Sequence, residues 1–297
     1  MTSFRSYSTA FKIFLAALLV CSCSSARYAP NTAYPAPKIN RIHAGHLESV
    51  TYPTLPPDGP RERRMFVYLP EGYYESQKRY PVLYMLHGAR GNELSWIERA
   101  DMLDCADSLV QAGKMEETIL VFNNLNPYKD DADYAYSRCK NAFESFFGIT
   151  GVAQSEFMET VVHTVDSLYR TIPDKEHRAI AGMSLGGMDS IHLTATHPQS
   201  FGYVGLFSPL VHSVVKSSPR SSFYKNLKQK QVAQFENPPA LYIIMIGKTD
   251  IFHPIMECWR RDLAKRGYNY EYVLSPGGHE WYNWKDYGII FLQRLWK

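Results

Sequence analysis

The sequence predicts one α/β domain in which a mainly parallel sheet lies between two layers of helices. Three observations predict it. The chain of 297 residues is long enough for one large domain. From residue 49 onward, short apolar strand-like runs alternate with amphipathic helical ones. No internal repeat or interior linker interrupts this alternation. A chain of this length could at most hold two small domains instead of one large one.

Composition narrows the class of protein. Hydrophobic residues make up 45% and charged residues 21% of the chain, which is ordinary for a globular protein. The formal net charge is only +3, and the basic residues are scattered along the chain. Because a nucleic-acid-binding surface needs clustered Lys and Arg, nucleic acid is not expected as a partner.

The N-terminus is typical of an export signal. Arg5 and Lys12 precede an apolar run at 13–20 that is too short for a stable membrane span. Cys23 follows a small residue, with Val20 three positions ahead, and this pattern resembles a relaxed bacterial lipobox. Cleavage before Cys23 would leave a lipid-modified N-terminus. Ordinary cleavage a few residues later, which would discard both Cys21 and Cys23, is the alternative.

We therefore expect three regions: a signal peptide at 1–22, a flexible tether at 23–44 that is rich in Ser, Ala, Pro and Asn, and the folded domain at 45–297. The predicted location is a bacterial membrane, facing the periplasm or the cell surface, through a lipid anchor. A secreted protein is the alternative location. Three cysteines follow the signal, and they allow one disulfide with one thiol or three free thiols: Cys105, Cys139 and Cys258. Cys258 is expected in the core.

Hydrophobic periodicity places the elements in order along the chain. Short apolar runs predict strands at 64–69, 81–86, 118–122, 177–181, 203–207, 241–246 and 270–274. Helices are expected at 96–112, 155–169, 187–197, 255–266 and 284–295. The polar, less regular segments 125–154 and 212–238 are expected to be long loops of the kind that cap an active site.

One motif carries most of the functional information. Between the strand at 177–181 and the helix at 187–197 lies Gly182-Met183-Ser184-Leu185-Gly186, which fits Gly-x-Ser-x-Gly. In this pattern the serine occupies a strained strand-to-helix turn, and only glycine leaves room for the strand and helix to pass so closely. Five residues alone can match by chance, but the strand–motif–helix order supports the pattern. We interpret Ser184 as a nucleophile rather than as part of a structural turn.

A serine nucleophile needs a base, and the base needs an orienting carboxylate. Asp250 follows the apolar strand at 241–246, and His279 lies in a Gly-rich loop after the strand at 270–274. The order serine, acid, histidine is the one expected for this motif. Asp262 is the rival acid but falls within a predicted helix. His253 follows the acid with no strand between them.

Catalysis at an ester carbonyl also needs N–H donors for the developing oxyanion. One candidate is the backbone N–H of Leu185, directly after the serine. The other is that of Ala89, in the glycine-containing loop 87–92 after an early strand. His87 is expected to support this loop by hydrogen bonding rather than to act as a second base. This chemistry requires no metal and no organic cofactor.

Four segments in combination resemble the putative esterase family: residues 68–74, 79–88, 169–187 and 276–281. That family includes esterase D, the family-1 carbohydrate esterases with their feruloyl and acetylxylan esterases, enterochelin esterases and the antigen 85 mycolyltransferases. The resemblance covers about residues 45–297. It implies the α/β-hydrolase fold, the triad Ser184, Asp250 and His279, and oxyanion donors at Ala89 and Leu185. Where relatives often have glycine after Phe-Ser, this chain has Pro209.

The resemblance and the export signal together imply a serine esterase that removes feruloyl or acetyl groups from plant polysaccharide through an acyl-enzyme. Its partner would be an acylated carbohydrate. Trp96 and Trp281 are candidate pocket rings for an aromatic acyl group, and plain packing is the alternative for each. An acyltransferase that passes the acyl group to a sugar hydroxyl is a second possible function. A non-catalytic glycan-binding surface protein is a third.

Overall fold

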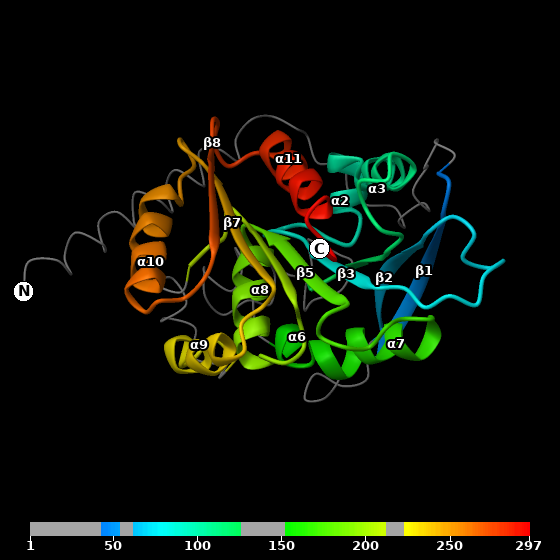
Figure 1. Ribbon diagram of the computed structural model, residues 1–297, viewed down its shortest axis with the longest axis horizontal. Helices are drawn as coiled ribbons and strands as arrows, with labels where there is room; N and C mark the ends of the chain where they lie inside the picture. Colours follow the sequence, from blue (N-terminus) through cyan, green and yellow to red (C-terminus); the bar gives the residue numbers. More distant parts are fainter. Residues whose placement is uncertain (1–42, 54–61, 126–151, 212–222) are drawn as a thin grey trace, which may run out of the picture. The chain divides into compact units, whose positions relative to one another are not determined.

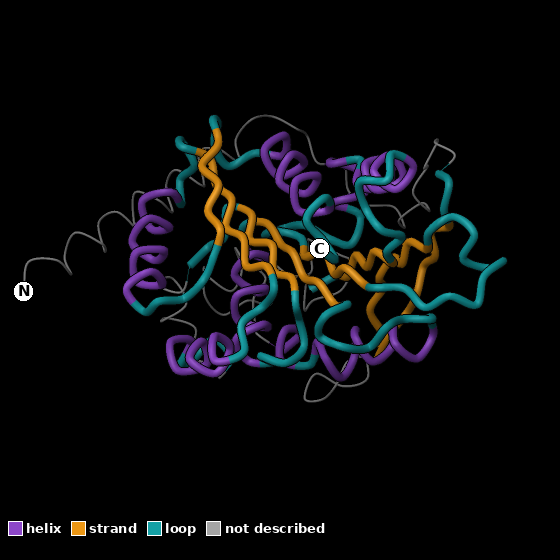
Figure 2. Tube along the Cα trace, in the orientation of Figure 1, coloured by secondary structure: helices purple, strands orange, loops and turns teal. Residues whose placement is uncertain are grey.

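The computed structural model describes residues 43–53, 62–125, 152–211 and 223–297. Cys23, Cys139, most of the predicted loop at 125–154 and the first part of the predicted loop at 212–238 lie outside the described residues. Within them the chain builds an eight-stranded sheet with the order β1-β2-β4-β3-β5-β6-β7-β8. Figure 1 shows this sheet between helices, and Figure 2 shows its strands as one continuous layer.

Six neighbouring strands of the sheet run parallel and form its centre and one side. They are β4 (Ile119–Asn123), β3 (Val82–Leu86), β5 (Arg178–Met183), β6 (Tyr203–Phe207), β7 (Leu241–Gly247) and β8 (Glu271–Ser275). All of the residues in β3, β4, β5, β6 and β7 are buried. Strands covered on both faces read as continuous apolar runs, which is why the sequence revealed them. The predicted mainly parallel sheet is confirmed.

The other side of the sheet is antiparallel. β1 (His46–Pro53) pairs with β2 (Glu62–Leu69), and β2 pairs with β4. The sequence did not predict β1. Most of its residues are exposed or half-buried, so it lacks the apolar run that marks a buried strand.

Helices pack on both sides of the sheet, as Figure 1 shows. On one side α2 (Ser95–Ala100) and α3 (Met102–Gln111) pack against α11 (Trp281–Leu292). On the other side α8 (Leu185–Thr196) crosses β3, β5 and β6 and contacts α6 (Val152–Ser155) and α9 (Leu227–Glu236). The remaining described helical elements are the π-helical turn η1 (Met158–Val162), α7 (His163–Leu168) and α10 (His253–Lys265).

The structure corrects three helix predictions. The expected helix at 96–112 is two helices, because Asp101 adopts the left-handed conformation with φ of 48° between α2 and α3. The expected helix at 155–169 contains the π-helical turn η1. Part of the expected loop at 212–238 is α9, whose polar sequence carries little helical periodicity. Hydrophobic periodicity does not record a backbone break at one residue or a single π-helical turn, and it is weak in α9.

Two of the cysteines are described, and both are free thiols. Cys105 is half-buried on α3, while Cys258 lies exposed on α10. The expectation that Cys258 is a core residue is therefore wrong, because α10 buries the side that carries Met256, Trp259 and Leu263. Among the described helices, none combines the length and apolar character that a bilayer span requires.

Candidate active site

Ser184 lies on a strained turn where β5 ends and α8 begins. Its φ of 56° and ψ of −112° are unusual for a residue with a side chain. The flanking glycines make this turn possible. A Cβ at Gly182 would overlap the backbone of Gly186, and a Cβ at Gly186 would come within 2.5 Å of the His87 carbonyl oxygen. The local sequence therefore places the Ser184 side chain at the carboxyl end of the sheet.

Neighbouring chain segments hold this turn from the side of β6. The Ser184 N–H donates to the Phe207 carbonyl at 2.9 Å, and the Leu210 N–H donates to the Ser184 carbonyl at 2.9 Å. Pro209 packs against Gly187, where a Cβ would approach the Pro209 Cβ to 2.8 Å. The proline that departs from the family pattern thus packs beneath the start of α8.

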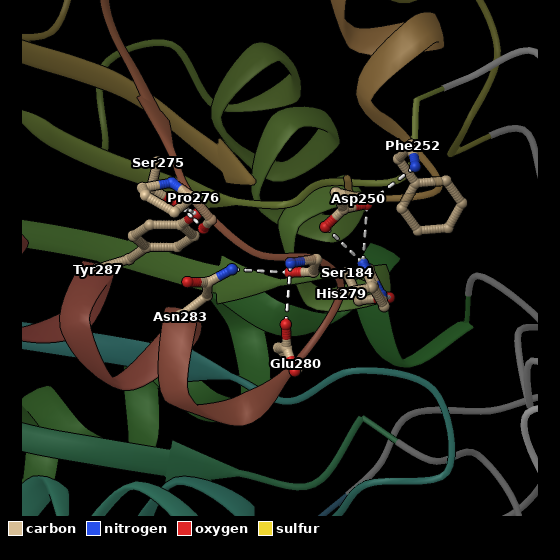
Figure 3. Close-up of polar contacts among 10 residues, drawn as sticks. Ser184, Asp250, Phe252, Ser275, Pro276, His279, Glu280, Asn283 and Tyr287 are labelled. Atoms are coloured by element: carbon tan, nitrogen blue, oxygen red, sulfur yellow. Dashed lines mark hydrogen bonds and ion pairs between the residues drawn. The ribbon is translucent and has the colours of Figure 1, made fainter. Parts of the chain in front are cut away.

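His279 joins the predicted serine and the predicted acid (Figure 3). Its Nε2 lies 2.9 Å from Ser184 Oγ, and its Nδ1 lies 2.9 Å and 3.1 Å from Oδ2 and Oδ1 of Asp250. With Nδ1–H donated to the carboxylate, the Nε2 lone pair faces the serine hydroxyl. In the sequence His279 lies 29 residues after Asp250 and 95 residues after Ser184. The structure brings together the residues that the sequence singled out.

Burial and ring packing fix the acid and the base. The Asp250 side chain is fully buried, and its Oδ1 also accepts the Phe252 N–H at 2.8 Å. The imidazole of His279 lies edge-on between Phe252 and Trp284, with ring centroids 4.8 Å and 4.9 Å away. Sequence analysis missed both rings. The sequence signal that could have found them is their closeness to the triad residues, because Phe252 follows Asp250 by two positions and Trp284 follows His279 by five.

The two candidate oxyanion donors lie next to Ser184. Within the described part of the chain, the backbone N–H groups of Ala89 and Leu185 donate no hydrogen bond. Leu185 is the first residue of α8, where helix geometry leaves the N–H unpaired. Gly88, beside Ala89, packs on the serine, since a Cβ there would lie 3.4 Å from Ser184 Cβ. Neither N–H group is therefore occupied by another described acceptor, and Gly88 brings the loop that carries Ala89 beside the serine.

His87 supports the loop that carries Ala89. Its Nδ1 donates to the Gly88 carbonyl at 2.7 Å, and its Nε2 accepts the Leu125 N–H at 3.0 Å. Burial lowers the pKa of His87, which keeps the ring neutral. Both ring nitrogens are engaged, so His87 has the structural place that the sequence predicted.

The two candidate pocket tryptophans have different surroundings. Trp96 is 1% exposed, its Nε1 donates to the Leu86 carbonyl at 3.0 Å, and its ring packs edge-on against Phe207. The structure therefore corrects the expectation for Trp96, which belongs to the core because its ring and its N–H are both engaged by buried neighbours. Trp281 is half-buried, lies 5.2 Å from the Trp284 ring and carries the Arg99 guanidinium 4.9 Å from its centroid. Trp281 stays a candidate.

The fold and this Ser–His–Asp arrangement define an α/β-hydrolase with the site of a serine esterase. The family described as "Putative esterase" matches residues 59–287 of the chain. The chain belongs to that family.

Two curated relatives are bacterial xylan-degrading enzymes. The chain is 29% identical over 267 residues to "Endo-1,4-beta-xylanase/feruloyl esterase" of Xylanibacter ruminicola. The aligned region covers 86% of the chain and 32% of that protein. The chain is also 26% identical over 155 residues to "Endo-1,4-beta-xylanase Y" of Acetivibrio thermocellus. Here the aligned region covers 48% of the chain and 12% of that protein. The chain thus spans a third or less of the length of these relatives.

Solved structures show the same fold. A CE1 ferulic acid esterase from the anaerobic fungus Anaeromyces mucronatus superposes with a TM-score of 0.69 at 23% identity, over 88% of this chain and 94% of that one. An S-formylglutathione hydrolase from Staphylococcus aureus superposes with a TM-score of 0.64 at 17% identity, over 85% and 98%. The α/β-hydrolase fold predicted from the sequence is confirmed.

Proposed function

We propose that this serine esterase removes feruloyl groups, or related acyl groups, from plant cell-wall polysaccharide outside the cell, with Ser184, His279 and Asp250 as its catalytic triad. The observation that carries the proposal is the hydrogen-bonded chain from Ser184 Oγ through His279 to the buried Asp250. A glycan-binding module needs none of these groups, so their alignment favours catalysis over binding alone.

The geometry supports acyl transfer through a covalent intermediate. Ser184 Oγ attacks the ester carbonyl carbon while its proton passes over 2.9 Å to His279 Nε2. Asp250 stabilises the imidazolium that forms. The N–H groups of Ala89 and Leu185 bind the negative oxygen of the tetrahedral intermediate. The intermediate collapses as His279 returns the proton to the departing alcohol. Water then attacks the acyl-enzyme by the same proton path in reverse, which releases the acid and restores Ser184.

The substrate class rests on similarity. One curated relative carries feruloyl esterase in its name, and several structural neighbours are ferulic acid esterases. Trp281 offers an aromatic face two residues after His279 and is our candidate contact for a hydroxycinnamoyl ring. Export and a lipid anchor at Cys23 would place the enzyme where polysaccharide is available. That part of the proposal stands on the N-terminal sequence alone.

A panel of esters with the Ser184→Ala variant tests the proposal. Methyl ferulate, methyl p-coumarate and methyl acetate compare the acyl groups with the same leaving alcohol, and Ser167→Ala, an exposed serine on α7, is the matched control. Loss of a triad nucleophile should lower kcat by about 10³-fold or more, whereas the control should match the wild type. Wild-type turnover by folded Ser184→Ala would refute the triad. A preference for methyl acetate over methyl ferulate would refute the feruloyl assignment.

The same assay separates hydrolysis from transfer. A xylo-oligosaccharide is added as acceptor, and free ferulate and acylated sugar are both quantified. We expect ferulate to dominate. Acylated sugar as the main product would assign the chain to the acyltransferases instead.

A further inference from the structure

Asn283 connects α11 to the loop that carries His279. It lies in the first turn of α11, is 3% exposed, and its Nδ2 donates to the Gly278 carbonyl at 2.8 Å. Gly278 directly precedes His279, so this bond holds the peptide group that leads into the candidate base. Figure 3 shows the Asn283 amide pointing away from α11 along this hydrogen bond.

The Asn283 amide also fills the space where the acid loop and the base loop meet. A Cβ at Gly247 would lie 3.0 Å from Asn283 Nδ2, and a Cβ at Gly277 would lie 2.9 Å from it. Gly247 ends β7, three residues before Asp250. Gly277 turns the base loop with φ of 83°. The two glycines leave the volume that this amide occupies.

Backbone bonds couple the same two loops. The Thr249 N–H donates to the Gly277 carbonyl at 3.0 Å, and the Lys248 N–H donates to the Ser275 carbonyl at 2.9 Å. Glu280 binds the Gly278 N–H at 2.9 Å, but this carboxylate bond is exposed to solvent. A hydrogen bond is stronger where water is excluded, so the part-buried bond from Asn283 is the firmer of the two side-chain restraints on Gly278.

We propose that Asn283 is a positioning residue, which holds the Gly278 carbonyl and thereby sets the imidazole of His279 at hydrogen-bonding distance from both Ser184 and Asp250. This inference rests on the proposed role of His279 as the base. Asn283 acts only through His279 and does not touch the substrate. Its loss should therefore impair the chemical step and leave substrate affinity unchanged.

Asn283→Asp is the sharpest perturbation. The side chain keeps its size and shape, but the N–H donor becomes a carboxylate oxygen that repels the Gly278 carbonyl. The matched control is Asn237→Asp, the same chemical change at an exposed amide that donates to Gln199. Three quantities are measured: kcat and KM for p-nitrophenyl acetate, the rate of inactivation by a fluorophosphonate probe, and the folded fraction by circular dichroism.

For Asn283→Asp we expect kcat to fall about 10- to 100-fold, because small misplacements of a catalytic group carry penalties of this size. KM should stay within about twofold, which marks an interaction that acts only in the transition state. Fluorophosphonate inactivation should slow by a similar factor, since it also needs the serine activated by His279. Asn237→Asp should match the wild type in every measurement.

A kcat within about twofold of the wild type, or a loss confined to KM, would overturn the positioning role. So would a loss of activity equal to the loss of folded protein. If Asn283→Asp does not fold, the same measurements on Asn283→Ala test the positioning role by the same criteria. Hydrolysis that survives Ser184→Ala would remove the proposed function and this inference together. A Ser184-dependent enzyme indifferent to both Asn283 variants would overturn the positioning role alone.

Discussion

Asp189 is a buried carboxyl group that should make the stability of this protein depend on pH. It lies on α8, five residues after Ser184, and is 1% exposed. Its Oδ1 accepts the hydroxyl of Tyr224 at 2.8 Å, and its Oδ2 accepts Gln154 Nε2 at 3.1 Å. Among the ion pairs of the described residues, none includes Asp189. Burial raises the pKa of Asp189 to about 7, and the two hydrogen bonds only partly oppose this rise.

The perturbation is Asp189→Asn, which removes the charge and keeps the shape. The asparagine oxygen can still accept the Tyr224 hydroxyl. Gln154 can rotate its amide to accept from the new N–H₂ group. The packing and the hydrogen bonds that connect α8 to α6 and to Tyr224 are therefore retained, and the ionisation is the main difference between the two proteins.

The direction in which stability changes with pH follows from proton binding in the folded and unfolded states. The pKa is 3.8 in an unperturbed carboxyl and about 7 in the folded protein. Between these values the folded state still holds a proton that the unfolded state has lost, so the stability of the wild type falls as pH rises through this window. Each pH unit is worth about 1.4 kcal/mol, so ionised Asp189 costs the fold about 4 kcal/mol above pH 7. The variant does not incur this cost.

Urea unfolding of both proteins at several pH values between about pH 4 and pH 8 measures the effect. The stability of Asp189→Asn relative to the wild type should rise by about 4 kcal/mol across this range. Taking the difference removes the contribution of every other titrating group. Asp286→Asn, an exposed carboxyl on α11, is the control and should show no such trend. A difference for Asp189→Asn that stays constant within about 0.5 kcal/mol would refute the reasoning.

Two further predictions concern the acid and the anchor. Asp250→Asn should lower kcat by about 10⁴-fold, because an amide facing Nδ1 favours the wrong imidazole tautomer; steady-state kinetics measure it, and an unchanged rate would pass the role to another carboxylate such as Asp262. Cys23→Ser should abolish labelling by a fatty-acid analogue in cells and move the protein from the membrane to the soluble fraction, since the several acyl chains of a bacterial lipoprotein anchor it stably. Unlabelled wild type with an N-terminus beyond Ser24 would show ordinary secretion.

Features that depend on one short stretch of chain were predictable from the sequence. The central strands are buried on both faces, and this imposes apolar runs that periodicity detects. The turn at Ser184 needs glycines on both sides for steric reasons, so its motif is local. Asp250 and His279 were found because parallel strands deliver their loops to the same edge of the sheet. The candidate site was therefore predictable in its residues and in their order along the chain.

Features that depend on contacts between distant segments came only from the tertiary structure. Sequence patterns did not distinguish Trp96 from Trp281 as pocket candidates, yet packing against Phe207 and Leu86 buries Trp96, whereas Trp281 is half-buried. The amide of Asn283 can reach the base loop only because two glycines from separate loops leave room for it. Asp189 has its raised pKa because the folded protein buries its carboxyl group, and the hydrogen bonds from Gln154 and Tyr224 only partly offset this burial. Local patterns report the periodicity of one segment, whereas burial, distance and electrostatics are properties of the assembled fold.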